Sequence, residues 1–219
     1  MNSIDSLIFP SRLQGAVDLL YLAGDQLQEN RPAVTRGEAC YYVMTSGSCA
    51  LVREGVPDEL LSEGDIVLLA RGSAHKLAVS REAVMELSPC DERHIVFNGN
   101  ATARPGSRNN VPSLNLLCGR ITDIPSALLF SGLPDLIKVS YTDHASPRLR
   151  QLIEIILGET ERARPGASFI LAEFSVALFA MILRVWLELI PVTEDALAQV
   201  HDAHVAASAS ETFARPAEP

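Results

Sequence analysis

Short segments rich in β-forming residues, separated by turn residues, fill the first two thirds of this 219-residue chain. Turns such as Ser46-Gly47 and Glu63-Gly64-Asp65 lie between them. Many short strands at close spacing are typical of a β-sandwich or β-barrel. We therefore expect a mainly β fold with these strands: Ala16–Ala23, Ala39–Thr45, Ser48–Arg53, Gly64–Ala70, His75–Ser80, His94–Asn98 and Val111–Ile121.

A helical pattern replaces the strands after Pro147. Apolar residues from Leu149 to Ile156 recur with the spacing of an amphipathic helix, which we expect to end near Gly158. After the turn Arg164-Pro165-Gly166, a second helix is predicted from about Ser168 to Leu189. The sequence thus predicts a barrel over residues 1–145, a helical hairpin over 146–190 and a weakly structured, Ala-rich tail over 191–219.

Charge and cysteine content exclude several classes of protein. The chain has 18 basic and 27 acidic residues, a net charge of -9, and no cluster of Lys and Arg, so we expect no direct binding to nucleic acid. The N-terminus lacks the basic region of a signal peptide, and the four widely spaced cysteines form no CxxC pair. A reduced cytoplasmic location, with no membrane span, is the expectation.

The segment Gly64–His75 has the sharpest local pattern. Gly64 permits a tight entry into a strand, and Gly72 permits a sharp exit from it. His75 then begins the next strand, with its side chain expected to point into the barrel. The spacing resembles the second cupin motif, with Ala70 in place of the usual proline.

The hairpin Cys40–Cys49 resembles the first cupin motif around its closing Gly47. Cys40 stands where metal-binding cupins carry a glutamate. The window Ala33–Arg36, where the paired histidines usually lie, contains none. Of the usual metal ligands, only His75 is present.

The order of motifs over roughly residues 10–190 resembles the cupin sensor domain at the N-terminus of AraC-type transcription regulators. The resemblance rests on Tyr42–Val52, Gly64–His75, Leu114–Ile121, the ARPG turn and the helix end Arg184–Ile190. It implies a jelly-roll barrel that binds a small-molecule effector, with helices that mediate dimerisation. The family's helix-turn-helix part would follow near residue 195, and the sequence to Pro219 shows no such pattern.

Four residues are candidates for a ligand site. Cys40 and Tyr42 share strand parity and so face one side, where they could line a pocket with His75 and Cys118; packing roles are equally consistent. Imidazole and thiolate together suit zinc, so His75, Cys40 and Cys118 are also candidate zinc ligands. The purely structural alternatives are a hydrogen-bonding role for His75 and a buried apolar role for Cys118.

Effector sensing in a regulatory context is the favoured function. The alternative is a stand-alone metal-dependent cupin enzyme, an oxygenase or isomerase, which would need three or four His and carboxylate ligands. A third is an interaction module with a filled barrel.

A homodimer through residues 147–189 is expected as well. The stretch Phe174–Leu183 carries no charge, and one amphipathic helix cannot cover it on every side. Phe174, Leu178 and Met181 would otherwise remain exposed.

Overall fold

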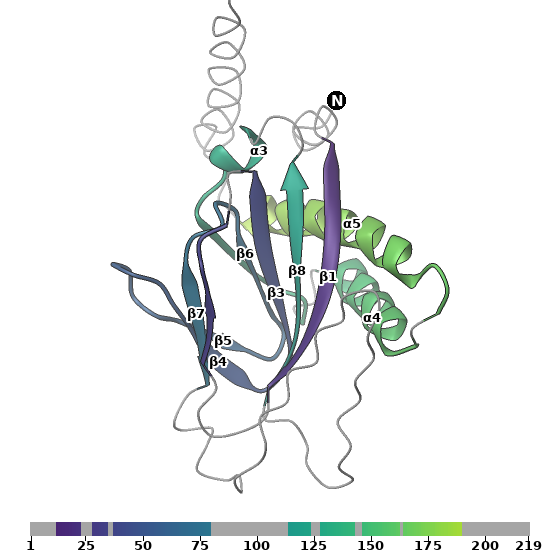
Figure 1. The fold of residues 1–219 in the computed structure, drawn as a ribbon, viewed down its shortest axis with the longest axis horizontal. Coiled ribbons are helices and arrows are strands. Elements are labelled where there is room, and N and C mark those ends of the chain that lie inside the picture. The colour runs from purple at the N-terminus through teal and green to yellow at the C-terminus, as the bar shows by residue number, and fades with distance from the viewer. Residues whose placement is uncertain are drawn as a thin grey trace, which may run out of the picture.

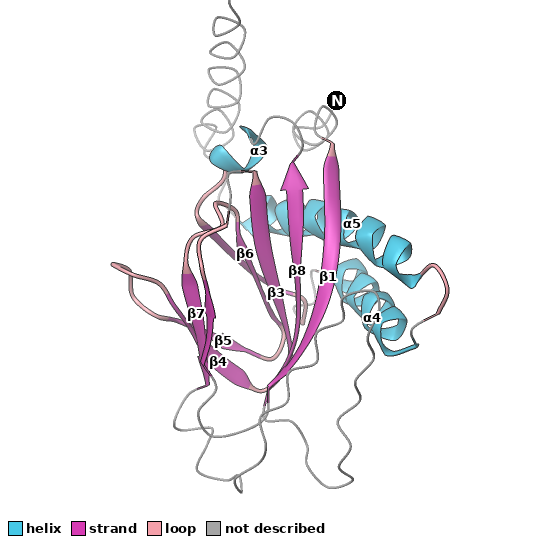
Figure 2. Cartoon of the chain, in the orientation of Figure 1, coloured by secondary structure: helices cyan, strands magenta, loops and turns pink. Residues whose placement is uncertain are grey.

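Two antiparallel β-sheets packed face to face form the body of the protein (Figures 1 and 2). The computed structural model describes residues 12–22, 28–34, 37–79, 114–123, 128–142, 146–162 and 164–189. The larger sheet has the strand order β1-β8-β3-β6-β9 and the smaller one β2-β7-β4-β5. The strands are β1 (Leu13–Leu22), β2 (Gln28–Arg31), β3 (Glu38–Ser46), β4 (Ser48–Val52), β5 (Glu59–Ser62), β6 (Asp65–Leu69), β7 (His75–Val79), β8 (Leu114–Asp123) and β9 (Leu136–Ser140).

The larger sheet is buried on both faces, as strand β3 illustrates. Cys40, Tyr42 and Met44 face the smaller sheet, whereas Tyr41 and Val43 face the helices. This alternation follows from the two-residue period of a strand. The core between the sheets contains Cys40, Tyr42, Met44, Cys49, Leu51, Leu61, Val67, Leu69, Leu77, Leu114, Leu116 and Cys118.

Two helices, α4 (Pro147–Arg162) and α5 (Ala167–Leu189), cover the outer face of the larger sheet (Figure 1). The short helix α3 (Leu128–Ser131) lies between β8 and β9 in the chain. The expected end of the first helix at Gly158 was wrong: α4 continues to Arg162, because one glycine weakens a helix interior without ending it. Leu178, which was expected on the surface that a dimer would cover, is instead buried within the core of the protomer.

Helix α5 is long and apolar enough to cross a membrane by length and composition. In this fold it packs against β1, β8, β9 and α4, and seven of its residues are buried. A core helix of a globular domain has the same properties, and Phe174 and Met181 pack half-buried against that core.

Close approach between α5 and the sheet depends on two glycines. A side chain at Gly15 would collide with Ala172 and Ser175 of the helix, and one at Gly119 would collide with Tyr41 and the Ala16 carbonyl. Because Gly119 leaves this space, the Tyr41 ring passes over β8 and its hydroxyl bonds Ser175 Oγ. Ser175 in turn donates to the Ala16 carbonyl at 3.4 Å.

At the other border of the sheets, Lys138 joins strands β9 and β5. Its ammonium donates to Glu59 Oε1 at 2.9 Å and to the Leu60 carbonyl at 2.8 Å, and lies 3.3 Å from Asp65 Oδ2. Strand β5 is an edge strand of the smaller sheet, and β9 is an edge strand of the larger. One side chain thus bridges two sheet edges.

The predicted mainly β body followed by a helical hairpin is confirmed. The predicted strand His94–Asn98, the tail 191–219 and Cys90 lie outside the described residues. The predicted domain boundary between the barrel and the helical hairpin, at residue 146, stays a prediction. Both helices share one hydrophobic core with the larger sheet. The prediction missed β2, β5, β9 and α3.

Candidate ligand site at the end of the barrel

The glycine-framed segment positions His75 as the first residue of β7. Gly64 and Gly72 adopt positive φ angles of 95° and 59°, a region that L side chains rarely enter. A side chain at Gly72 would also collide with Val34. The chain therefore turns sharply after β6 and delivers His75 to a buried position, with 6% of its surface exposed.

Both ring nitrogens of His75 are hydrogen-bonded. Nδ1 lies 2.7 Å from the Ser73 carbonyl, which can only accept, so Nδ1 carries the proton. Nε2 of the neutral ring is then an acceptor, and the Tyr42 hydroxyl donates to it at 2.6 Å. The two rings meet edge to face, with centroids 5.4 Å apart. His75 and Tyr42 thus join the smaller sheet to the larger.

Asp135, just before β9, extends this network. Arg53 Nη1 donates to Asp135 Oδ2 at 2.6 Å, and the Ser73 hydroxyl bonds Asp135 Oδ1. The backbone carbonyl of Ser73 also accepts a hydrogen bond from His75. A continuous series of hydrogen bonds therefore runs from Arg53 through Asp135, Ser73 and His75 to Tyr42.

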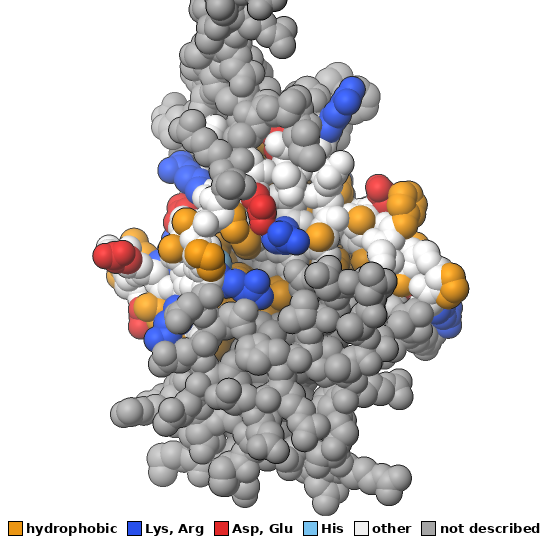
Figure 3. Space-filling view, in the orientation of Figure 1, with side chains coloured by type: hydrophobic (Ala, Val, Ile, Leu, Met, Phe, Trp, Pro, Cys, Tyr) orange, Lys and Arg blue, Asp and Glu red, His pale blue; other side chains and the backbone are white. Residues whose placement is uncertain are grey.

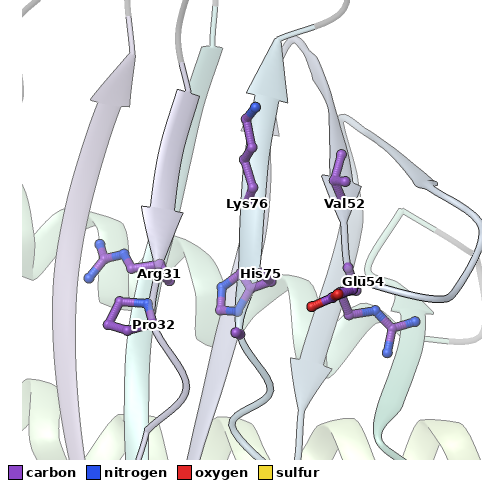
Figure 4. Close-up of a pocket in the computed structure, with 8 residues that line it drawn as sticks. Arg31, Pro32, Val52, Glu54, His75 and Lys76 are labelled. Carbon is purple, nitrogen blue, oxygen red and sulfur yellow. The ribbon is translucent and has the colours of Figure 1, made fainter.

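A cavity of about 520 Å³ opens beside this chain of hydrogen bonds, where β2, β7 and β4 end. Figure 4 shows Arg31 and Pro32 on one side of His75 and Glu54 on the other, with the Glu54 carboxylate turned toward His75. The guanidinium of Arg31 is turned away from His75, and Lys76 extends along β7. The lining consists of Arg31, Pro32, Val52, Arg53, Glu54, Ala74, His75 and Lys76.

Of the four candidates from the sequence, His75 alone lines the cavity. Tyr42, Cys40 and Cys118 lie behind it in the core between the sheets, where Tyr42 bonds His75. Sequence reasoning missed Arg31, Arg53, Glu54 and Lys76. The sequence does contain a signal for them, because charged residues directly flank the strand ends next to His75. The strand Gln28–Arg31 itself could not be predicted, since it has no β-forming residue.

The residues present do not fit the metal centre that cupin enzymes imply. Among the described residues, no three His, Cys, Asp or Glu side chains are placed to hold a metal ion, so His75, Cys40 and Cys118 do not assemble the suggested zinc site. Burial and the charge of Glu38 raise the pKa of Cys40 to about 11, which opposes the thiolate that zinc requires. Both nitrogens of His75 are already engaged.

We expect the stability of the protein to fall as the pH drops below about 6.5, in part through His75. Burial lowers the pKa of His75 from its ordinary value of 6.5, with Arg31 and Arg53 acting in the same direction and the Ser73 hydrogen bond opposing them. The unfolded chain therefore binds the proton first. The stabilisation is complete above pH 6.5 and is lost as the pH falls toward the folded-state pKa.

Urea unfolding of the native protein and of a His75→Gln variant, from about pH 7.5 to pH 5, measures this contribution. The variant should show a shallower loss of unfolding free energy with acidification. Parallel profiles for the two proteins would contradict the assignment.

Three solved structures of ToxT from Vibrio cholerae are among the similar folds. The unsaturated-fatty-acid-bound form has 12% sequence identity and a TM-score of 0.40, and the alignment covers 79% of this chain and 56% of that one. The complex with (E)-4-(8-methylnaphthalen-1-yl)but-3-enoic acid gives 14% identity, a TM-score of 0.39, and coverage of 80% and 57%. A further ToxT structure gives 16%, 0.37, and coverage of 84% and 58%.

The chain thus spans somewhat more than half the length of these proteins. Similarity at these scores does not extend to their ligands. A comparison with curated protein sequences found no match. The profile of the family described as Cupin, in contrast, matches residues 8–188, which is most of the chain. This range includes all the described strands and nearly all of α5. The predicted relationship is therefore confirmed at the level of the family, and this chain belongs to the cupin family.

Proposed function

We propose that this cupin domain is a small-molecule-sensing regulatory module, related to the effector-binding domain of AraC-type regulators, and that the cavity beside His75 is its effector site. The carrying observation is the cavity itself, whose volume of about 520 Å³ lies in the range of small-molecule sites. His75 both lines it and bonds the core residue Tyr42. An occupant of the cavity would therefore act on a residue that joins the two sheets.

A metal-dependent enzyme is less well supported. Such a site needs a metal with open coordination positions, held by three or four side chains. Within the described segments, His75 is the single histidine, and its two nitrogens bond Tyr42 and Ser73.

Filling the cavity tests the proposal. Ala74 is exposed and lines the cavity, so Ala74→Trp should occupy the space without disturbing the core. Small molecules that raise the melting temperature of the native protein should lose this effect in the variant. Gln151→Trp, an equal enlargement at an exposed position on α4, is the control and should leave the responses intact. Ligand responses that survive Ala74→Trp unchanged would refute the cavity as the effector site.

Regulation by this domain is proposed to act without direct DNA contact and in the cytoplasm. Among the described residues on the face shown in Figure 3, Lys and Arg side chains are scattered among hydrophobic and acidic ones and are not clustered. Cys40 and Cys49 are buried as thiols rather than joined in disulfides, which suits a reducing compartment.

A second copy of the chain is the proposed partner of the helical hairpin. Ile155 on α4 is 50% exposed and Phe169 on α5 is 71% exposed. Figure 3 shows hydrophobic side chains at the edge of the molecule where α4 and α5 lie. Apolar side chains gathered on a surface favour association, and two-fold symmetry would bury each of them twice.

Phe169→Asp should weaken this dimer at least 100-fold, an order-of-magnitude expectation from about 1.5–3 kcal/mol for each of two buried side chains. Sedimentation equilibrium measures the change. Val56→Asp makes the same kind of substitution at a 43% exposed residue distant from the helices and should leave the dimer intact. A native protein that sediments as a monomer of 23.7 kDa at high concentration would refute the dimer.

A further inference from the structure

We propose that the effector of this cavity is an organic anion, specifically a carboxylate on a small apolar body. This inference rests on the proposed function, because it names the chemical class of ligand that the same cavity accepts. It depends on the charges, the strand register and the apolar surface of the lining.

The lining is positively charged although the chain as a whole is acidic. It contains three basic side chains, Arg31, Arg53 and Lys76, and the carboxylate of Glu54. Asp135, which pairs with Arg53, adds a second carboxylate next to the lining, so the basic groups outnumber the acidic ones three to two. The whole protein carries a net charge of -9. His75 adds no charge near neutral pH, since its pKa is lowered. A local excess of positive charge in a concave site attracts anions.

Strand register places the two arginines on either side of His75. Arg31 on β2 pairs directly with His75 on β7. On the other side, Val52 of β4 pairs with Lys76, so the next residue, Arg53, is at the level of His75. Both guanidinium charges act on the imidazole. His75 thus lies between two arginine positions in the strand register, and the Arg31 guanidinium is turned away from the imidazole.

Arg53 retains donor capacity at this position. Its side chain is 15% exposed, and one terminal nitrogen bonds Asp135. Its Nε is buried and has no hydrogen-bond partner among the described residues. A carboxylate oxygen is the acceptor that a guanidinium binds best.

The remaining lining is apolar. Pro32, Val52 and Ala74 supply hydrocarbon surface, and so do the methylene groups of the basic side chains. This surface favours a carboxylate with an apolar body over a free inorganic anion. Glu54, with its carboxylate turned toward His75 in Figure 4, is the internal competitor for the positive charges.

Three ring compounds of nearly equal shape separate charge from size: benzoate is anionic, benzamide neutral and benzylamine cationic near pH 7.5. Titration calorimetry with the full chain at low salt should show benzoate binding most tightly and benzylamine most weakly. Raising the salt concentration should weaken benzoate alone, because salt screens the attraction.

Two charge-neutralising variants of opposite sign sharpen the test. Lys76→Gln should weaken benzoate binding about 3- to 10-fold, whereas Glu54→Gln should tighten it about 2-fold or more. The matched controls Arg148→Gln and Glu154→Gln make the same changes at exposed positions of α4 and should alter the affinity little. These lining residues have exposed or half-exposed side chains, so the variants should fold normally.

Each other outcome overturns the proposal in a distinguishable way. No detectable benzoate binding at millimolar concentration, or equal weakening by Lys76→Gln and Arg148→Gln, refutes the anion site. Tighter binding of benzamide or benzylamine that disappears in Ala74→Trp refutes the anion but keeps the effector cavity. Binding of all three compounds that Ala74→Trp leaves unchanged refutes the effector cavity as well.

Discussion

Gly119→Ala should lower the free energy of unfolding by about 3 kcal/mol or more, because the added methyl group has no space. It would meet the Ala16 carbonyl of β1 and the Tyr41 ring at distances that real contacts do not reach. Strand β8 must then move away from β1, or Tyr41 must lose its hydrogen bond with Ser175. Urea unfolding followed by circular dichroism measures the loss.

Gly158→Ala is the matched control. No atom lies within 4 Å of the position of the added methyl group, and Gly158 sits inside α4. Alanine is the better helix former by about 1 kcal/mol, so this variant should be as stable as the native protein or more stable. If Gly119→Ala behaved like Gly158→Ala, the close approach of Tyr41 would not be needed for stability.

Phe179→Ala should cost about 3–5 kcal/mol, the range for removing a buried aromatic ring. Phe179 on α5 is 1% exposed, and its ring meets that of Phe130 on α3 edge to face at 5.8 Å. The substitution leaves a cavity between the helix and the sheet and breaks the aromatic pair.

Phe169→Ala removes the same ring from an exposed position of the same helix and should change protomer stability by less than about 0.5 kcal/mol. Any effect through the proposed dimer would vary with protein concentration, which separates the two causes. Thermal and urea unfolding of both variants measure the difference. Similar losses in the two variants would show that α5 is not docked as described.

The parts of the fold that the sequence predicted are those with a strong local signal. Strand β3 has a continuous run of buried apolar and β-forming residues, and α5 has a long uninterrupted apolar run. Two of the missed strands lack such a signal: β2 reads Gln-Glu-Asn-Arg, and β5 has four residues. Such strands form because neighbouring strands offer hydrogen-bonding partners, a tertiary cause that no local pattern reveals. The third missed strand, β9 (Leu136–Ser140), alternates between buried and half-buried residues and was overlooked.

The candidate site was predictable only as far as the backbone dictates it. Gly64 and Gly72 need positive φ angles, and this need placed His75 at a strand start in advance. The charged lining depends on register: Arg31 lies opposite His75 because β2 pairs with β7. Cys40 and Cys118 were predicted as ligands by residue type, and they lie in the core between the sheets, where no described group of three metal-binding side chains includes them.

The lysine that bridges β5 and β9 has a consequence for solubility. An edge strand offers unpaired backbone groups to any other extended chain, and this is how sheets from separate molecules stack into aggregates. Lys138 donates a hydrogen bond to the Leu60 carbonyl of β5 and places a positive charge where a strand of another molecule would have to pair. Lys138 should therefore hinder the edge-to-edge pairing of β5 with a strand of another molecule.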